Sequence, residues 1–124
     1  AHLAGYPNPH LTPDAREWDY GAFEGLTHDQ IAAQHPTWNI FLEGAPKGES
    51  PKDIAQRGKR LLEELTSLKR GPLLLFSHGH FLRALAALWI GLDVSAGRLF
   101  TLSVASVSHL GYERGQRVIH VWNG

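Results

Sequence analysis

Hydrophobic residues recur at helical spacing over one long segment in the middle of the chain: Ile54, Leu61, Leu62, Leu65 and Leu68. This spacing places them on one face of an α-helix. Ser50 is a favourable N-cap, Pro51 fits the first helical position, and an acidic residue, Asp53, follows in the first turn. The pattern predicts an amphipathic helix that begins at Pro51 and runs to about Leu68.

Two shorter helices are predicted before this one. Thr27 and Gln30 form a capping box for a helix through Gln34, and Thr37 can cap a second helix through Leu42. The first five residues resemble the last turn of a helix that ends at a glycine, so the chain is expected to begin within an element. Residues 15–25 mix charged, aromatic and glycine residues without a period, which indicates a loop or a short extended segment.

A continuous apolar run, Leu73–Phe76, has the length of a strand and lies between Gly71 and Ser77–Gly79. It predicts a strand buried on both faces, as in a parallel sheet. Phe81–Ile90 is apolar on nearly every side and ends at Gly91, which predicts a buried helix against that strand. The two elements would form half of a βαβ unit.

Apolar and polar residues alternate in three later segments, 99–104, 107–112 and 118–122. Each is predicted to be a strand, and residues 113–117 would join the last two as a hairpin. Helices and strands together indicate an α/β protein, with residues 1–124 expected to form a single domain.

Composition narrows the classes of function. Lys+Arg and Asp+Glu both number 12, so the chain has no basic excess for nucleic acid or for a membrane surface, and a small soluble molecule is the expected partner. With Cys at 0, disulfides and thiolate metal sites are excluded, which fits a cytoplasmic protein. No apolar run reaches the roughly 20 residues that a membrane helix needs.

The segment Ser77–His80 is the first candidate for chemistry. It follows a predicted strand and opens a helix, and ligands of α/β proteins bind at such places. The free N–H groups of a helix start favour anions, Gly79 permits close backbone approach, and an imidazole beside a phosphate is pushed toward its cationic form. The alternative is that His78 is a turn residue that caps the helix.

His78 and His80 together also suggest a metal site, because imidazole suits zinc. A zinc site needs further ligands, and neither Cys nor a closely following Asp or His provides them. No metal and no other cofactor is therefore expected.

Three motifs occur in an order that resembles the histidine phosphatase superfamily, whose fold is phosphoglycerate-mutase-like. They are Glu17–Gly25, Gly48–Ser50, and Ser77–Gly79 with the helix that follows. The resemblance spans essentially the whole chain. It implies a three-layer sandwich with a mostly parallel central sheet, N-terminally incomplete here, and a metal-independent reaction on a small phosphorylated metabolite.

The resemblance also assigns roles to residues. In this family a histidine attacks phosphorus, and water later releases phosphate from the phosphohistidine. Glu17 matches the proton donor to the leaving oxygen, and His78 matches the second pocket histidine; His78 and Gly79 would bind phosphate. Glu49 and Arg83 are expected to serve the scaffold, Glu49 by starting the long helix. Four aromatic residues are candidates for a lid or pocket or for simple core: Trp18, Tyr20, Trp38 and Phe41.

The family's Arg-His-Gly nucleophile segment has no counterpart in the chain. His2 and His10 do not replace it, because neither follows a buried strand or precedes the required glycine. The 124 residues are thus expected to be the C-terminal portion of the fold, inactive alone, and completed by an N-terminal segment or by another copy of the chain. A phosphatase is the leading hypothesis; a phosphoglycerate-mutase-type phosphotransferase and a catalytically dead phosphate-binding protein are the alternatives.

Overall fold

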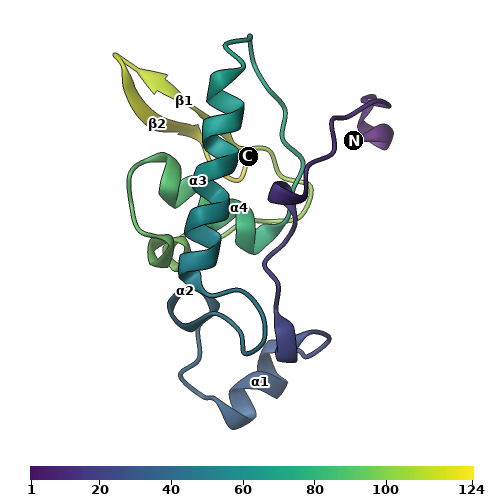
Figure 1. Cartoon of the computed structure of the whole chain (residues 1–124), viewed down its shortest axis with the longest axis vertical. Coiled ribbons are helices and arrows are strands. Elements are labelled where there is room, and N and C mark those ends of the chain that lie inside the picture. The colour runs from purple at the N-terminus through teal and green to yellow at the C-terminus, as the bar shows by residue number, and fades with distance from the viewer.

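The computed structural model describes all 124 residues and contains four α-helices and one antiparallel hairpin (Figure 1). The elements follow in the order α1 (His28–Gln34), α2 (Ile40–Glu43), α3 (Pro51–Ser67), α4 (Gly79–Trp89), β1 (His109–Glu113) and β2 (Gln116–Val121). Short 3₁₀ helices lie between them: η1 (His2–Ala4), η2 (Pro13–Ala15), η3 (Gly21–Phe23) and η4 (Val94–Leu99). None of the helices is long and apolar enough to cross a membrane.

Local capping sets the starts of the helices. The Ser50 hydroxyl accepts a hydrogen bond from Asp53 N (3.1 Å) and the Asp53 carboxylate accepts one from Ser50 N (2.9 Å), so α3 begins where the sequence predicts. The capping box at the start of α1 is confirmed as well. The predicted cap of α2 is wrong, because the Asn39 side chain accepts from Phe41 N (2.9 Å) and takes the place expected for Thr37.

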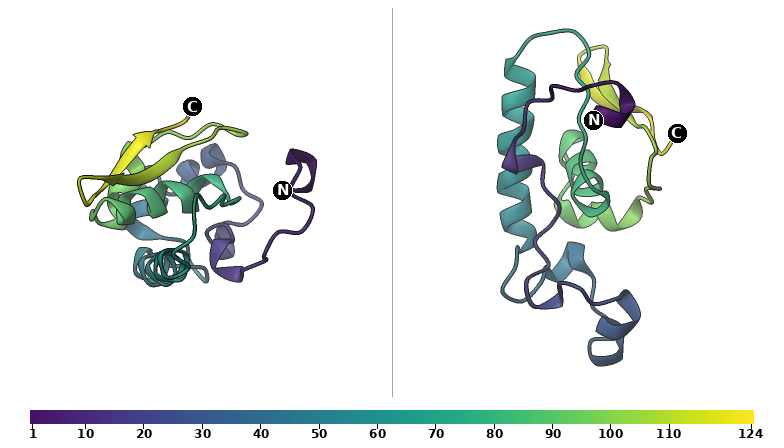
Figure 2. Two further views of the ribbon diagram at one scale, coloured as in Figure 1. Left: turned by 90° about the horizontal axis from the view of Figure 1, so that it is seen from above. Right: turned by 90° about the vertical axis from the view of Figure 1, so that its right-hand side faces the viewer.

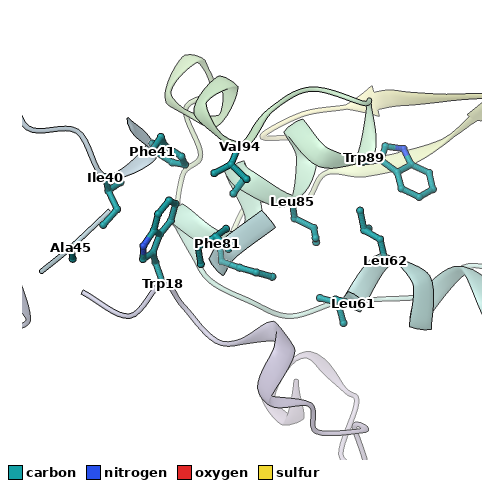
Figure 3. Close-up of a cluster of buried hydrophobic side chains, with 12 residues drawn as sticks. Trp18, Ile40, Phe41, Ala45, Leu61, Leu62, Phe81, Leu85, Trp89 and Val94 are labelled. Atoms are coloured by element: carbon teal, nitrogen blue, oxygen red, sulfur yellow. The ribbon is translucent and has the colours of Figure 1, made fainter. Parts of the chain in front are cut away.

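Helix α4 lies between α3 and the hairpin (Figure 2). Its facing residues, Phe81 and Leu85, are buried against Ile54 and Leu61 of α3 in the core shown in Figure 3. Trp18 from the loop before η3 completes this core and packs edge-on against Phe41, with ring centroids 5.5 Å apart; both are among the largest fully buried side chains. The core thus fixes the loop that carries Glu17 onto α4.

The predicted hairpin is confirmed, with both strands shifted toward a shorter turn. Arg114 and Gly115 form the turn, and both have positive φ (50° and 80°), as a two-residue hairpin turn requires. Trp89 at the end of α4 donates from Nε1 to Gly111 O (3.3 Å) and Val118 O (3.1 Å). Residues 1–5 form the predicted turn, which is a 3₁₀ turn closed by Gly5 at φ 88°.

Two predicted strands are absent. Leu73–Phe76 is extended but pairs with no other segment, and Leu73, Leu74 and Phe76 are 46%, 53% and 45% exposed instead of buried on both faces. Residues 94–99 form η4, and residues 100–103 lie outside helices and strands. The only sheet is the hairpin, so a parallel central sheet is not present within these residues. The physical reason is that a strand needs a neighbour for its backbone groups, and neither segment has one here.

Candidate active site

The Glu17 carboxylate lies on the N-terminus of α4. Its Oε1 accepts hydrogen bonds from Trp18 N and Phe81 N, both at 2.9 Å, and its Oε2 accepts one from His80 N at 3.2 Å. Two of these donors belong to the first turn of α4, where N–H groups lack helical partners and the helix dipole favours a negative group. The first turn of α4 therefore helps to fix the orientation of the Glu17 side chain.

His78 is the N-cap residue of α4, but its side chain makes no capping hydrogen bond. His78 thus occupies the cap position that the alternative interpretation gave it, but its exposed imidazole takes no part in capping and is free for another partner. Glu17, His78 and Gly79 all line one cavity of about 970 Å³. The structure thus brings the three predicted site residues to the same cavity.

The expected binding of an anion to the helix N–H groups needs a correction. Two of these groups, those of His80 and Phe81, already donate to Glu17. Gly79 N, which forms no hydrogen bond within the chain, is the donor left for a ligand beside the His78 ring. Gly79 has open space around it, since an added Cβ would meet no atom within 4 Å.

Arg57 is the site-forming residue that sequence reasoning missed. The residue is 2% exposed, and its guanidinium donates to the backbone carbonyls of Asp14 (2.9 Å), Arg16 (2.8 Å) and Glu17 (3.2 Å) and lies over the Phe81 ring at 4.3 Å. The three carbonyls belong to the segment that leads to Glu17. Arg57 therefore positions the backbone of Glu17 against α4.

Glu49 is the counter-ion of Arg57. Its two carboxylate oxygens accept from Arg57 Nε and Nη2, both at 2.9 Å, and Oε1 also accepts from Asp19 N at 2.9 Å. The expectation that Glu49 starts the long helix is wrong, because Ser50 and Asp53 do so. A signal for this pair was present in the sequence: Arg57 lies three residues after Ile54 and four before Leu61, on the apolar face of α3, where a charge needs a partner.

A second cavity, of about 370 Å³, is lined by His80, whose backbone N–H donates to Glu17. Tyr20 and Trp38 line it as partly exposed side chains, whereas Phe41, which also borders it, is buried in the core with Trp18. The Tyr20 hydroxyl is 2.6 Å from His80 Nδ1. Burial raises the pKa of Tyr20, and the negative charge of Glu17 adds to this shift.

His80 is half-buried in the wall of this smaller cavity. Burial lowers the pKa of its imidazole; the Glu17 carboxylate opposes this shift and the Arg83 cation adds to it. His78 lines the larger cavity and His80 the smaller, so the two rings do not converge on one point. No group of three or more His, Cys, Asp or Glu side chains is arranged to hold a metal ion.

The family model described as "Histidine phosphatase superfamily (branch 1)" matches residues 2–124. The chain belongs to this superfamily. A solved structure of a protein encoded by an open reading frame of Mycobacterium tuberculosis, 35% identical to the histidine phosphatase chain, superimposes on it with a TM-score of 0.93 and covers 98% of it. The α/β fold class expected for a histidine phosphatase is therefore confirmed.

Two curated relatives differ in their named activities. An acid phosphatase of M. tuberculosis is 36% identical over 122 residues, which are 98% of this chain. A probable phosphoglycerate mutase of Erwinia tasmaniensis is 29% identical over 119 residues, 90% of the chain. This histidine phosphatase chain spans only 60% and 55% of the lengths of these two relatives, and 64% of the solved chain.

Proposed function

We propose that this chain is the C-terminal portion of a single phosphomonoesterase domain that works through a phosphohistidine, without a metal, on a small phosphorylated metabolite. The observation that carries the proposal is the Glu17 carboxylate, anchored on α4 and lining the same cavity as the unbound His78 ring. The similarity to an acid phosphatase over 98% of the chain supports hydrolysis.

In the first step, a histidine nitrogen attacks phosphorus and the bond from phosphorus to the ester oxygen breaks. Glu17 donates its proton to the departing oxygen, so that an alcohol leaves instead of an alkoxide. His78 and Gly79 N donate to the non-bridging oxygens as negative charge redistributes. In the second step Glu17, now a carboxylate, takes a proton from water, which attacks phosphorus while the phosphorus–nitrogen bond breaks.

The nucleophilic histidine is proposed to come from a segment outside these 124 residues. His10 cannot serve, because it is exposed and lies 3.7 Å from Glu64, on the outer side of α3. His78 is already assigned to the non-bridging oxygens, and the His80 ring lies at the smaller cavity with its Nδ1 2.6 Å from the Tyr20 hydroxyl.

The larger cavity has the features expected of a binding site for that segment. It is bordered by residues 71–79 on one side and 102–112 on the other, and residues 72–77 form no backbone–backbone hydrogen bond. An inserted strand would satisfy these donors and acceptors, cover the exposed leucines and create the parallel central sheet. An N-terminal segment of the same protein is the proposed occupant; a second copy of the chain is the alternative.

Two other functions use the same residues. A mutase returns the phosphoryl group to a second hydroxyl of the bound molecule instead of to water, and the similarity to a phosphoglycerate mutase favours it as the second candidate. A phosphate-binding protein without turnover would keep His78 and Gly79 but need no proton donor.

The test is hydrolysis of aryl phosphates by the full-length protein in the presence of a chelator. We expect turnover that chelation does not change, none from the 124 residues alone, and a phosphoenzyme that acid destroys. Glu17→Gln should slow the hydrolysis of esters with poor leaving groups by about 100-fold or more and that of activated aryl esters far less, because only poor leaving groups depend on the donated proton. His2→Gln, at an exposed position that lines neither cavity, is the matched control.

Equal slowing of all esters by Glu17→Gln would contradict its role as the acid. Turnover by the purified 124 residues would contradict the external nucleophile. Transfer to a second hydroxyl without release of phosphate would establish the mutase, and binding of phosphate without any phosphoenzyme would establish the binding protein.

A further inference from the structure

Arg83 lines the smaller cavity without a carboxylate partner. Its Nε donates to Gly97 O (3.1 Å) and its guanidinium carbon lies 4.6 Å from the centre of the Phe41 ring. No acidic side chain lies within ion-pair distance, and the two Nη atoms form no hydrogen bond within the chain. Three other arginines of the chain, by contrast, are paired with Asp14 or Glu49.

The lining of the smaller cavity is an unfavourable environment for the Arg83 cation. The residues that line it are mostly aromatic or aliphatic, and none of them is Asp or Glu. Asn39 is engaged, since its side-chain oxygen caps α2. Burial also lowers the pKa of Arg83, against the effect of Glu17. A partly buried cation facing an apolar cavity is costly unless an anion pairs with it, and here the chain supplies none.

The position of the cavity connects it to the reaction. The ester oxygen must lie beside Glu17, whose Oε2 is bonded to His80 N, and the His80 ring forms part of the cavity wall. The larger cavity, which Glu17 lines, is the place proposed above for an inserted strand. The leaving alcohol is therefore expected to occupy the smaller cavity.

We infer that the smaller cavity binds the alcohol portion of the substrate, and that this portion combines a flat apolar body with an anionic substituent that pairs with Arg83. The inference rests on the proposed function. Tyr20 and Trp38 provide aromatic surfaces for the flat body, and the free Nη atoms provide donors for a carboxylate or a second phosphate. Arg83 is then a specificity-determining residue that touches substrate away from the phosphorus.

Two probes separate charge from shape: 4-carboxyphenyl phosphate and its neutral isostere, 4-carbamoylphenyl phosphate. For the full-length protein we expect KM to be about 10- to 100-fold lower for the carboxylate, as a charge-assisted hydrogen bond to a charged group implies. The effect should appear in KM and not in kcat, because the carboxylate is bound equally before and during the reaction.

The variants follow from the contacts of Arg83. Arg83→Gln keeps an N–H donor for Gly97 O but removes the charge, and it should reduce the ratio of the two KM values to about one. Arg83→Lys should keep part of the preference. Arg98→Gln is the matched control, because Arg98 is exposed on η4 and does not line the cavity. A preference that survives in Arg83→Gln, or that is absent from the unaltered protein, would overturn the inference.

A second measurement separates this inference from the proposed function. Binding of the product alcohols, 4-hydroxybenzoate and 4-hydroxybenzamide, can be followed calorimetrically without turnover. If neither ester is hydrolysed but the benzoate binds more tightly and Arg83→Gln removes the difference, the proposed function fails and the anion site stands. If both esters are hydrolysed and neither assay shows a preference, the proposed function stands and the anion site fails.

Discussion

Arg57 connects three parts of the molecule at a single side chain. It is held by Glu49 from the loop before α3, it binds carbonyls of residues 14–17, and it lies over Phe81 of α4. Taking a guanidinium out of water is costly, and these contacts together satisfy its five N–H donors. The segment that carries Glu17 thus depends on a buried ion pair as well as on apolar contacts.

Replacing Arg57 should show this dependence. Arg57→Met fills a similar volume but removes the buried cation beside Glu49 and leaves three carbonyls without a partner, so we expect the free energy of unfolding to fall by about 3 kcal/mol or more in urea unfolding. Arg60→Met is the matched control, since Arg60 pairs with Asp14 on the exposed side of α3. That control should cost far less, because solvent screens an exposed ion pair. Equal losses for the two variants would show that burial of the ion pair is not the cause.

His80 should make stability depend on pH. Because its pKa is lowered in the folded state, the unfolded state takes up a proton first as pH falls below about 6.5. The contribution of the neutral imidazole is fully present above that pH and is lost as pH falls toward the folded-state pKa.

His80→Gln should therefore reduce the loss of unfolding free energy between pH 7.5 and pH 5.5, as measured by urea unfolding at both values. His2→Gln, at an exposed position, should leave that loss unchanged. An identical pH dependence in His80→Gln and in the unaltered protein would contradict the lowered pKa of His80.

At the scale of elements, two loops approach so closely that glycine is required. Gly21 has φ 51°, and a Cβ there would lie 2.2 Å from Pro46 O; a Cβ on Gly48 would lie 2.3 Å from Asp19 O. The close approach permits the hydrogen bonds Ala22 N to Pro46 O (2.7 Å) and Glu49 N to Asp19 O (2.9 Å). It places Tyr20 at the smaller cavity and Glu49 beside Arg57.

Gly21→Ala should destabilise the protein by more than the left-handed backbone alone explains. Gly25→Ala is the matched control, because Gly25 has φ 80° but open space around it. We expect about 1–2 kcal/mol for the control and a larger loss for Gly21→Ala, which adds the clash with Pro46 O. Thermal or urea unfolding measures both losses, and similar values would mean that the loops separate without cost.

The sequence predicts elements well where the determinants are local. Caps at Thr27 and Ser50 and the apolar face of α3 depend on residues within a few positions of each other, and the corresponding helices are present. The Leu73–Phe76 strand depends on a distant partner, which the pattern of one segment cannot reveal, and no partner lies within these residues. Of the site, Glu17 and His78 came from a resemblance of motifs, whereas the Arg57 clamp depends on contacts more than 40 positions apart in the chain, such as that with Asp14 O.

At the scale of the whole molecule, apolar surface gathers around the larger cavity. The exposed side chains there are Leu73, Leu74, Phe76, Val104 and Val107, with Val104 97% exposed. Exposed apolar surface beside unpaired backbone groups favours association with another strand.

Hydrogen exchange should reveal whether another strand pairs with Leu73–Phe76. In the 124 residues alone, amides of Leu73–Phe76 should exchange nearly as fast as in an unfolded chain, because no acceptor protects them. In the full-length protein we expect slowing by about 1,000-fold or more. The amide of Leu61, within α3, should be protected in both and serves as the internal control. Equal exchange at Leu73–Phe76 in both proteins would contradict strand insertion at the larger cavity.

The hydrogen bonds from Arg57 to main-chain carbonyls offer a way to isolate the substrate. Because these bonds do not involve the Glu17 side chain, Glu17→Gln should leave the loop in place. The amide oxygen of the new glutamine can still accept a hydrogen bond from the N-terminus of α4. A folded variant that binds the natural ester but protonates the leaving group poorly would hold its ligand long enough for recovery from a cell extract. Mass spectrometry of the released molecule would then name the substrate directly.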